Sequence, residues 1–71
     1  MEHQANVILR GGGPLVPDEE RIRYVADPTE RLKLFLGNRY EHYQPTTARQ
    51  RHSDGRELLV FKWVYRTYVA E

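Results

Sequence analysis

The stretch that decides the fold is the C-terminal segment Glu57-Leu-Leu-Val-Phe-Lys-Trp-Val-Tyr-Arg-Thr-Tyr-Val-Ala70. It holds the single tryptophan of the chain and is rich in β-branched and aromatic residues, which suit the pleated surface of a sheet. Successive side chains of a strand point to opposite faces. Residues 58–61 are then apolar on both faces, as in a central strand, while one face of the second half carries Lys62, Arg66 and Tyr68. The segment predicts one long strand, which pairs with two neighbours or with its counterpart in a second subunit.

Four shorter strands are expected before this segment. The first ends at Gly11-Gly-Gly-Pro14, which we interpret as a turn and not as a phosphate-binding loop, because no Gly-Lys-Ser/Thr and no helix start follow it. The second alternates apolar and polar residues. The third and fourth would be joined at Gly37-Asn38, a favourable two-residue hairpin turn. The expected strands are 6–10, 21–26, 31–36 and 39–44.

A helix over 28–36 is the alternative to one of these strands. Asp27-Pro-Thr-Glu30 places Asp, Pro and Glu at the positions that favour a helix start, and apolar residues follow at helical spacing. The alternation in Arg31-Leu-Lys-Leu34 and the break at Gly37-Asn38 favour strands instead. The alternative fold class is α+β with this short helix.

Residues 45–56 are expected to form a flexible polar loop, because they show no periodicity and contain turn residues such as Asp54-Gly55. Five strands with turns at roughly ten-residue intervals are typical of a small all-β domain. The sequence therefore predicts one domain, 1–71, built as a five-stranded antiparallel meander or open barrel with a long C-terminal strand.

Composition narrows the classes of function. The formal net charge of +1 argues against a strongly basic nucleic-acid binder. With no cysteine and three scattered histidines, the sequence predicts no metal site and no cofactor. The polar N-terminus and the lack of an apolar run of about 18 residues predict a cytoplasmic protein without a membrane span. A chain of 71 residues has a small core, so forming a homodimer would help its stability.

The densest polar and aromatic segment is Asn38-Arg-Tyr-Glu-His-Tyr43. In a strand, Tyr40 and His42 share one face, and Arg39 and Glu41 share the other. One interpretation is a binding segment made by Asn38, Arg39, Tyr40, Glu41 and His42. The other is structural: Tyr40 and His42 cover the edge of the core, and Arg39 and Glu41 form an exposed ion pair that contributes about 0–1 kcal/mol.

A second cluster lies in the C-terminal strand. Trp63 and Tyr65 are expected in the core of so small a domain, while Arg66 and Tyr68, on the other face, are candidates for contact with a partner. Catalysis is not favoured, because the single serine, Ser53, lies in the predicted loop and no catalytic set is visible.

Three blocks of the sequence carry a resemblance: Asn6-Val-Ile-Leu-Arg-Gly-Gly-Gly13, Leu36-Gly-Asn-Arg-Tyr-Glu-His-Tyr43 and Phe61-Lys-Trp-Val-Tyr-Arg-Thr-Tyr-Val-Ala-Glu71. The chain resembles a family of very short actinobacterial, streptomycete-type proteins of unknown function, often encoded near natural-product genes. The resemblance spans nearly the whole chain and implies a cytoplasmic protein with an accessory role in secondary metabolism or its control. It brings no activity, ligand or catalytic residue.

Three hypotheses follow. The first is a non-enzymatic binding module that docks on a protein partner through 38–43 and the face of Arg66 and Tyr68. The second is a nucleic-acid-binding module that uses the arginines and stacking aromatic residues. The third is a small-molecule binder or enzyme whose site, with Glu41 and His42, is assembled across a dimer.

Overall fold

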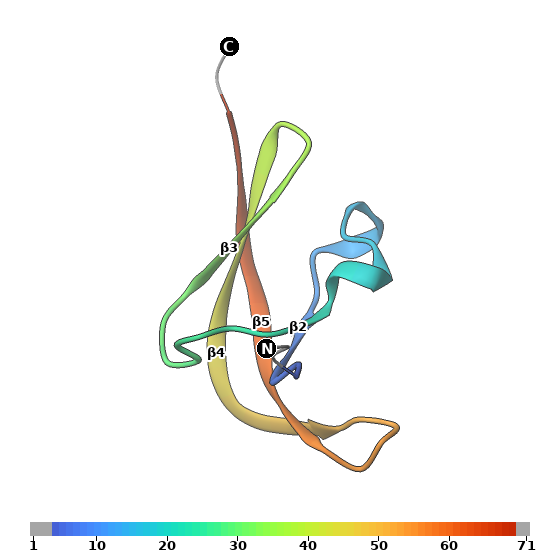
Figure 1. Ribbon diagram of the computed structural model, residues 1–71. Helices are drawn as coiled ribbons and strands as arrows, with labels where there is room; N and C mark the ends of the chain where they lie inside the picture. The colour runs from blue at the N-terminus through green and yellow to red at the C-terminus, as the bar shows by residue number, and fades with distance from the viewer. Residues whose placement is uncertain (1–3, 70–71) are drawn as a thin grey trace.

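The computed structural model describes residues 4–69 and contains one five-stranded sheet (Figure 1). The spatial order of the strands is β2-β1-β5-β4-β3, so the predicted C-terminal strand lies at the centre. The sheet is open, and the predicted all-β class is confirmed. The strands are β1 (Val7–Arg10), β2 (Ile22–Arg23), β3 (Leu32–Leu36), β4 (Arg39–Arg51) and β5 (Glu57–Tyr68).

The central strand β5 pairs with β4 on one side and with β1 on the other, as its length predicted. Its pairing with β1 is parallel, with Val7 beside Leu59 and Leu9 beside Phe61, so the sheet is mixed and not purely antiparallel. No hairpin links β1 to β5, and β1 buries Val7 and Leu9 in the core beside Phe61. Ala70, the last residue of the expected strand, lies outside the described residues.

The alternative helix over 28–36 is wrong, because residues 32–36 form β3. The helix-start signal at 27–30 makes a turn, in which the Asp27 carboxylate accepts hydrogen bonds from the backbone and the hydroxyl of Thr29. The hairpin turn predicted after β3 is confirmed. Gly37 has φ of 65°, and among residues 4–69 no non-glycine residue, Asn38 included, has positive φ, as a type II′ turn with glycine first requires.

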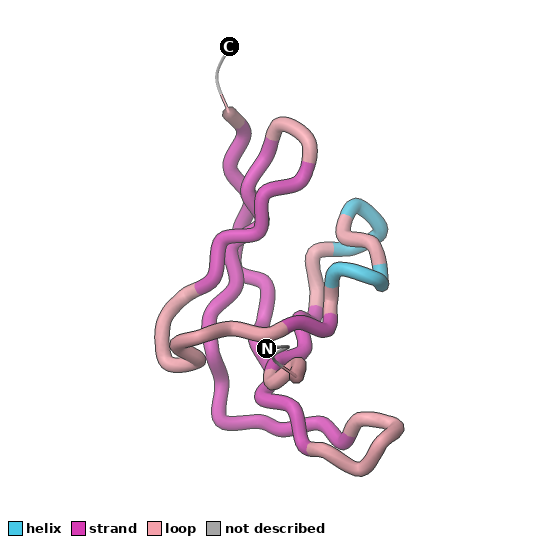
Figure 2. Tube along the Cα trace, in the orientation of Figure 1, coloured by secondary structure: helices cyan, strands magenta, loops and turns pink. Residues whose placement is uncertain are grey.

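The expected loop over 45–56 is mostly strand, because β4 continues to Arg51 and bends on the way (Figure 2). Between Pro45 and Arg49 the register shifts. There the Thr46 hydroxyl donates to the Val60 carbonyl at 2.7 Å and accepts from the Ala48 N–H at 3.1 Å. A side chain thus replaces part of the backbone ladder where proline lacks an N–H, which no hydrophobic pattern reveals. The turn itself is confined to residues 52–56.

A loop follows β1 and contains two single-turn 3₁₀ helices, η1 (Gly13–Leu15) and η2 (Asp18–Glu20). The guanidinium group of Arg21 fastens it by donating hydrogen bonds of 2.9 to 3.2 Å to four backbone carbonyls. The loop is not part of the sheet, so these hydrogen bonds from Arg21 hold its backbone in place of strand pairing. Its acceptors are the carbonyls of Leu9, Gly11, Gly13 and Val16.

The main core cluster lies on one face of the sheet, between the strands and this loop, while Ile8 and Leu58, which alternate with its residues, are also buried. Val16 is the loop's contribution to it and is 2% exposed. Away from the loop, the β3–β4 hairpin and the end of β5 extend together as a three-stranded arm (Figure 1). The buried core cluster consists of Val7, Leu9, Val16, Leu34, Tyr43 and Phe61.

Candidate functional site

A β-bulge in the central strand decides which side chains meet on each face of the arm. Tyr43 of β4 pairs with Trp63, but the preceding residue, His42, pairs with Tyr65, so Val64 is an extra residue in β5. The bulge reverses the alternation of side chains along β5. Trp63 and Arg66 therefore lie on the core face together, and Tyr65 lies on the opposite face.

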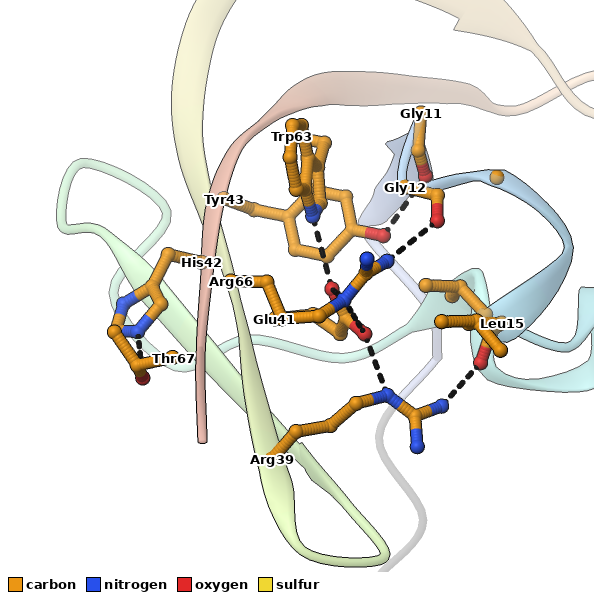
Figure 3. Close-up of polar contacts among 12 residues, drawn as sticks. Gly11, Gly12, Leu15, Arg39, Glu41, His42, Tyr43, Trp63, Arg66 and Thr67 are labelled. Atoms are coloured by element: carbon orange, nitrogen blue, oxygen red, sulfur yellow. Dashed lines mark hydrogen bonds and ion pairs between the residues drawn. The ribbon is translucent and has the colours of Figure 1, made fainter. Parts of the chain in front are cut away.

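On the core face, Glu41 is fully buried and forms the centre of a polar network (Figure 3). Its carboxylate accepts a hydrogen bond from Trp63 Nε1 at 2.9 Å and from Arg39 Nε at 2.8 Å. Arg66 Nε is shared between the two oxygens at 2.9 and 2.8 Å. The predicted Arg39–Glu41 pair on one face is present, but the prediction that it is exposed is wrong, because the bulge brings Trp63 and Arg66 over Glu41.

The same network ties the glycine-rich loop to the arm. Arg66 Nη2 donates to the Gly12 carbonyl at 2.8 Å, and Arg39 Nη2 donates to the Leu15 carbonyl at 2.5 Å. The Tyr43 hydroxyl donates to the Gly11 carbonyl at 3.0 Å (Figure 3). One buried carboxylate thus orients two arginines whose other nitrogens bind the loop backbone.

Burial would raise the pKa of the Glu41 carboxyl, but the hydrogen bonds from Arg66, Trp63 and Arg39 and the charge of Arg66 together hold this pKa below its usual value. Glu41 is therefore ionised at neutral pH. Because both of its oxygens already accept hydrogen bonds from these side chains, its role in this arrangement is to hold the arm and the loop together.

The opposite side of the arm carries a row of aromatic rings, which we call the aromatic face: Phe35, Tyr40, His42 and Tyr65. The rings of Phe35 and Tyr40 are 4.9 Å apart between centroids and tilted by 50°. His42 stacks on Tyr65 at 4.1 Å with an interplanar angle of 9°. These contacts join the four rings into one surface across β3, β4 and β5, because Tyr40 and His42 also approach each other at 6.4 Å.

The aromatic face is open to solvent. Phe35 is 53% exposed and Tyr65 is 43% exposed. Two polar side chains flank the rings: the Lys33 ammonium lies 5.2 Å from the centre of the Tyr40 ring, and His42 Nε2 lies 2.8 Å from the Thr67 hydroxyl oxygen. In Figure 3, His42 and Thr67 lie across the strands from Glu41, so the polar network and the aromatic face occupy opposite sides.

The structure divides the predicted site residues between these two places. The structural interpretation expected Tyr40 and His42 to cover the edge of the core. They lie instead on the aromatic face. Arg39, Glu41 and Arg66 bind one another and the loop. The predicted opposite orientation of Glu41 and His42 is confirmed, so the two do not form an acid–base pair.

The remaining two predicted residues lie near the tip of the arm. Asn38 is an exposed turn residue whose carbonyl accepts a hydrogen bond from the Val69 N–H at 2.7 Å. Tyr68 is 64% exposed and pairs in register with Arg39, on the core side of the sheet.

Sequence reasoning missed two rings of the aromatic face. Tyr65 was expected in the core, but the bulge turns it outward, and nothing in the order of residues marks Val64 as the extra one. Phe35 could have been found, because it alternates with Leu34 and Leu36 in a five-residue strand. Trp63 does pack against the core, although it is only partly buried.

The chain matches the model of a family described as "Family of unknown function (DUF5988)" over residues 1–71, and it belongs to that family. No curated protein and no solved structure matched the chain. Across residues 4–69, no helix is long and apolar enough to cross a membrane, and no three His, Cys, Asp or Glu side chains gather where they could hold a metal ion.

Proposed function

We propose that this protein is a non-enzymatic binding module that docks on a protein partner through its aromatic face. The observation that supports the proposal is the continuous row of four rings on the solvent side of three neighbouring strands. Exposed apolar patches of this kind are typical of interaction sites, and Tyr, Phe and Trp are enriched in protein interfaces. Covering Phe35 and Tyr65 would remove apolar surface from water, which contributes about 25 cal/mol per Å².

The polar network on the other side of the arm supports the proposal indirectly. Glu41 fixes Arg39 and Arg66 on the back of the same strands that carry Tyr40 and Tyr65. A platform that is held rigid before it binds loses less conformational entropy when the partner arrives. The network and the rings then have separate roles, one in folding and one in binding.

The test is a matched pair of substitutions on one strand. Tyr65 and Tyr68 are both exposed tyrosines of β5, but they lie on opposite sides of the sheet. Tagged wild-type protein, Tyr65→Ala and Tyr68→Ala would each be used to capture partners from the native host at low and high salt, with mass spectrometry as the readout. Tyr65→Ala should lose the captured protein, and Tyr68→Ala should retain it.

The opposite result would place docking on the core side of the arm, around Tyr68 and Arg39, and would contradict the proposal. Capture that is unaffected by either substitution would remove the arm from consideration altogether. Capture of nucleic acid that disappears at high salt would favour the second candidate below.

We place this docking in the cytoplasm, in secondary metabolism or its control, in an actinobacterial host. The support is the resemblance carried by the three sequence blocks and the composition, in which nine of the eleven basic residues are arginine. Capture from the native host tests this as well, because the identity of the captured protein names the process that it serves.

A second candidate function, binding of single-stranded nucleic acid, is favoured by one observation. The charges are unevenly distributed along the chain, although the net charge is near zero. Residues 31–69 contain eight basic and three acidic residues, and one of the three acids, Glu41, is buried in the network. Basic residues beside stacked rings suit the backbone and bases of a single strand. Binding of a short oligonucleotide should then weaken steeply as salt rises. Absence of binding at low salt would contradict this candidate.

A further inference from the structure

We propose that two copies of the chain associate through the outer edge of β3, in an antiparallel pairing centred on Leu34. The two five-stranded sheets would become one sheet of ten strands, and the two aromatic faces would adjoin. This inference stands apart from protein docking, because it concerns the backbone edge of the arm and not the surface of the rings.

The first observation is the free edge. β3 is the last strand of the sheet and pairs with β4 alone among the described strands. Leu36 and Arg39 flank the two-residue turn and form a hydrogen-bonded pair, and the pattern alternates from there. Leu34 thus directs its backbone groups to β4, while Lys33 and Phe35 direct theirs outward. An edge of this kind is a template for another strand.

The other edge of the sheet does not offer such a template. β2 has only two residues, Ile22 and Arg23. Just beyond it, the backbone of Val25 is occupied by the side-chain amide of Asn6, which accepts from its N–H at 2.8 Å and donates to its carbonyl at 2.9 Å. Proline and bulges, which commonly protect an edge, are missing from β3, whose sequence is Leu-Lys-Leu-Phe-Leu. Lys33 is the one edge-protecting residue it has, and the pairing proposed here places that lysine beside an aromatic ring and not beside another charge.

The second observation is self-complementarity. In an antiparallel pairing centred on Leu34, all five residues of β3 find a partner in the second copy, as a two-fold symmetric contact requires. Lys33 then lies opposite Phe35 of the second copy, and Phe35 lies opposite its Lys33. Both are residues whose backbone groups point outward, so they form the hydrogen-bonded pairs of the new ladder.

Charge selects this register over its neighbour. A pairing centred on Lys33 would place the two lysines directly opposite each other, which is unfavourable. In the register centred on Leu34, each ammonium group lies beside an aromatic ring, an arrangement that the chain already uses internally between Lys33 and Tyr40. Phe35, which is 53% exposed, would gain a neighbour on the side that is open in the single copy.

The test is a charge rescue followed by sedimentation over a range of concentrations. The wild-type protein should reach twice the chain mass of 8.4 kDa. Phe35→Lys places lysines opposite each other at two symmetric positions and should weaken dimerisation at least about tenfold. Adding Lys33→Glu to Phe35→Lys places Glu opposite Lys and should restore the dimer.

Two controls keep the result interpretable. Tyr65→Lys adds the same charge to the same face but on the central strand, so it should leave the dimer intact while abolishing partner capture. A double variant with cysteine at 33 and 35 should form intermolecular disulfides, because the paired Cα atoms would be about 5.5 Å apart and the chain has no other cysteine.

Three outcomes would overturn the inference: a wild-type protein that stays monomeric at every concentration, a dimer that Phe35→Lys does not weaken, or a dimer that the two cysteines do not cross-link. Partner capture that fails while the dimer passes these tests would count against protein docking only. Circular dichroism of each variant in the tryptophan region should match that of the wild-type protein, which would show that Trp63 keeps its packed environment and that the fold is intact.

Discussion

The two sides of β4 carry similar residues in different environments. On the core side, Glu41 and Tyr43 are buried, and their polar atoms bind Arg39, Arg66, Trp63 and the loop backbone. On the outer side, Tyr40 and His42 contact other rings and remain partly open to solvent. The comparison indicates that polar side chains tie the arm to the loop on the core side, while the aromatic side chains on the outer side stay exposed to solvent.

The largest effect on the free energy of unfolding is expected when the buried charge of Glu41 is removed. Glu41→Gln keeps the shape but replaces one acceptor oxygen by an NH₂ group that faces the donors of Arg66 and Trp63. The free energy of unfolding should fall by about 3 kcal/mol, the lower end of the range for a broken buried pair, because both arginines are partly exposed and can regain water. Urea denaturation measures it.

The matched control is Glu57→Gln, an exposed carboxylate at the start of β5, which should change the free energy of unfolding by less than about 0.5 kcal/mol. Equal effects of the two substitutions would mean that the network around Glu41 does not stabilise the fold.

The loop side of the network can be tested at Gly12. Its φ is 94°, and a Cβ atom there would lie 2.8 Å from Val16 Cγ2 and 3.0 Å from the Tyr43 hydroxyl oxygen. Gly12→Ala should cost about 2 kcal/mol of unfolding free energy, since it adds a clash to an unfavourable backbone conformation. Gly13→Ala is the control, because φ there is 71° and nothing lies near its Cβ position. Its cost should be about half as large.

Of the two sides of β4, the core side should respond to acid through Glu41. The pKa of Glu41 is lowered in the folded state, so its contribution to stability is present above the unfolded-state pKa of about 4.3 and is lost as pH falls through the folded-state pKa. Wild-type stability should therefore decrease below about pH 4.3, by less than Glu41→Gln costs, because the protonated oxygen of a carboxyl still has a lone pair that can accept a hydrogen bond, whereas the amide nitrogen of glutamine has none.

Thermal unfolding from pH 7 to acid checks this, with Glu41→Gln as the comparison. The variant should show a flatter profile, and its remaining slope should come from Asp27 and Asp54, whose pKa values are lowered by hydrogen bonds from Thr29 and from the Arg56 backbone. An identical slope in both proteins would contradict the assignment to Glu41.

The smallest effect on stability is expected on the aromatic face. Tyr65→Ala removes one ring that stacks on His42 in a solvent-exposed position, so the free energy of unfolding should fall by about 1 kcal/mol or less. The same urea titration measures it. A loss as large as that of Glu41→Gln would show that the rings belong to the core in energetic terms, and the contrast between the two sides would disappear.

The sequence predicted the all-β class, the central C-terminal strand and the hairpin at Gly37-Asn38, because each depends on local residue preferences. It did not predict that residues 45–51 extend β4, since a threonine side chain supplies part of that ladder. Nor could it place Glu41, whose burial depends on Trp63 and Arg66 arriving from a distant strand. Local preference finds strands, but long-range partners decide which polar residue is inside.

The extra residue Val64 shifts the phase of side-chain alternation along β5 by one position. Along β5, the side chains of residues 57–63 alternate between the two faces in one phase, and those of residues 65–68 alternate in the opposite phase. Loss of that single codon would remove the bulge and leave Tyr65 and Arg66 on their present sides, because a regular strand then places Trp63 inward, Tyr65 outward and Arg66 inward. What keeps Arg66 beside Glu41 is therefore the bulge itself, because a strand with Val64 in regular alternation would turn Arg66 outward and Tyr65 inward.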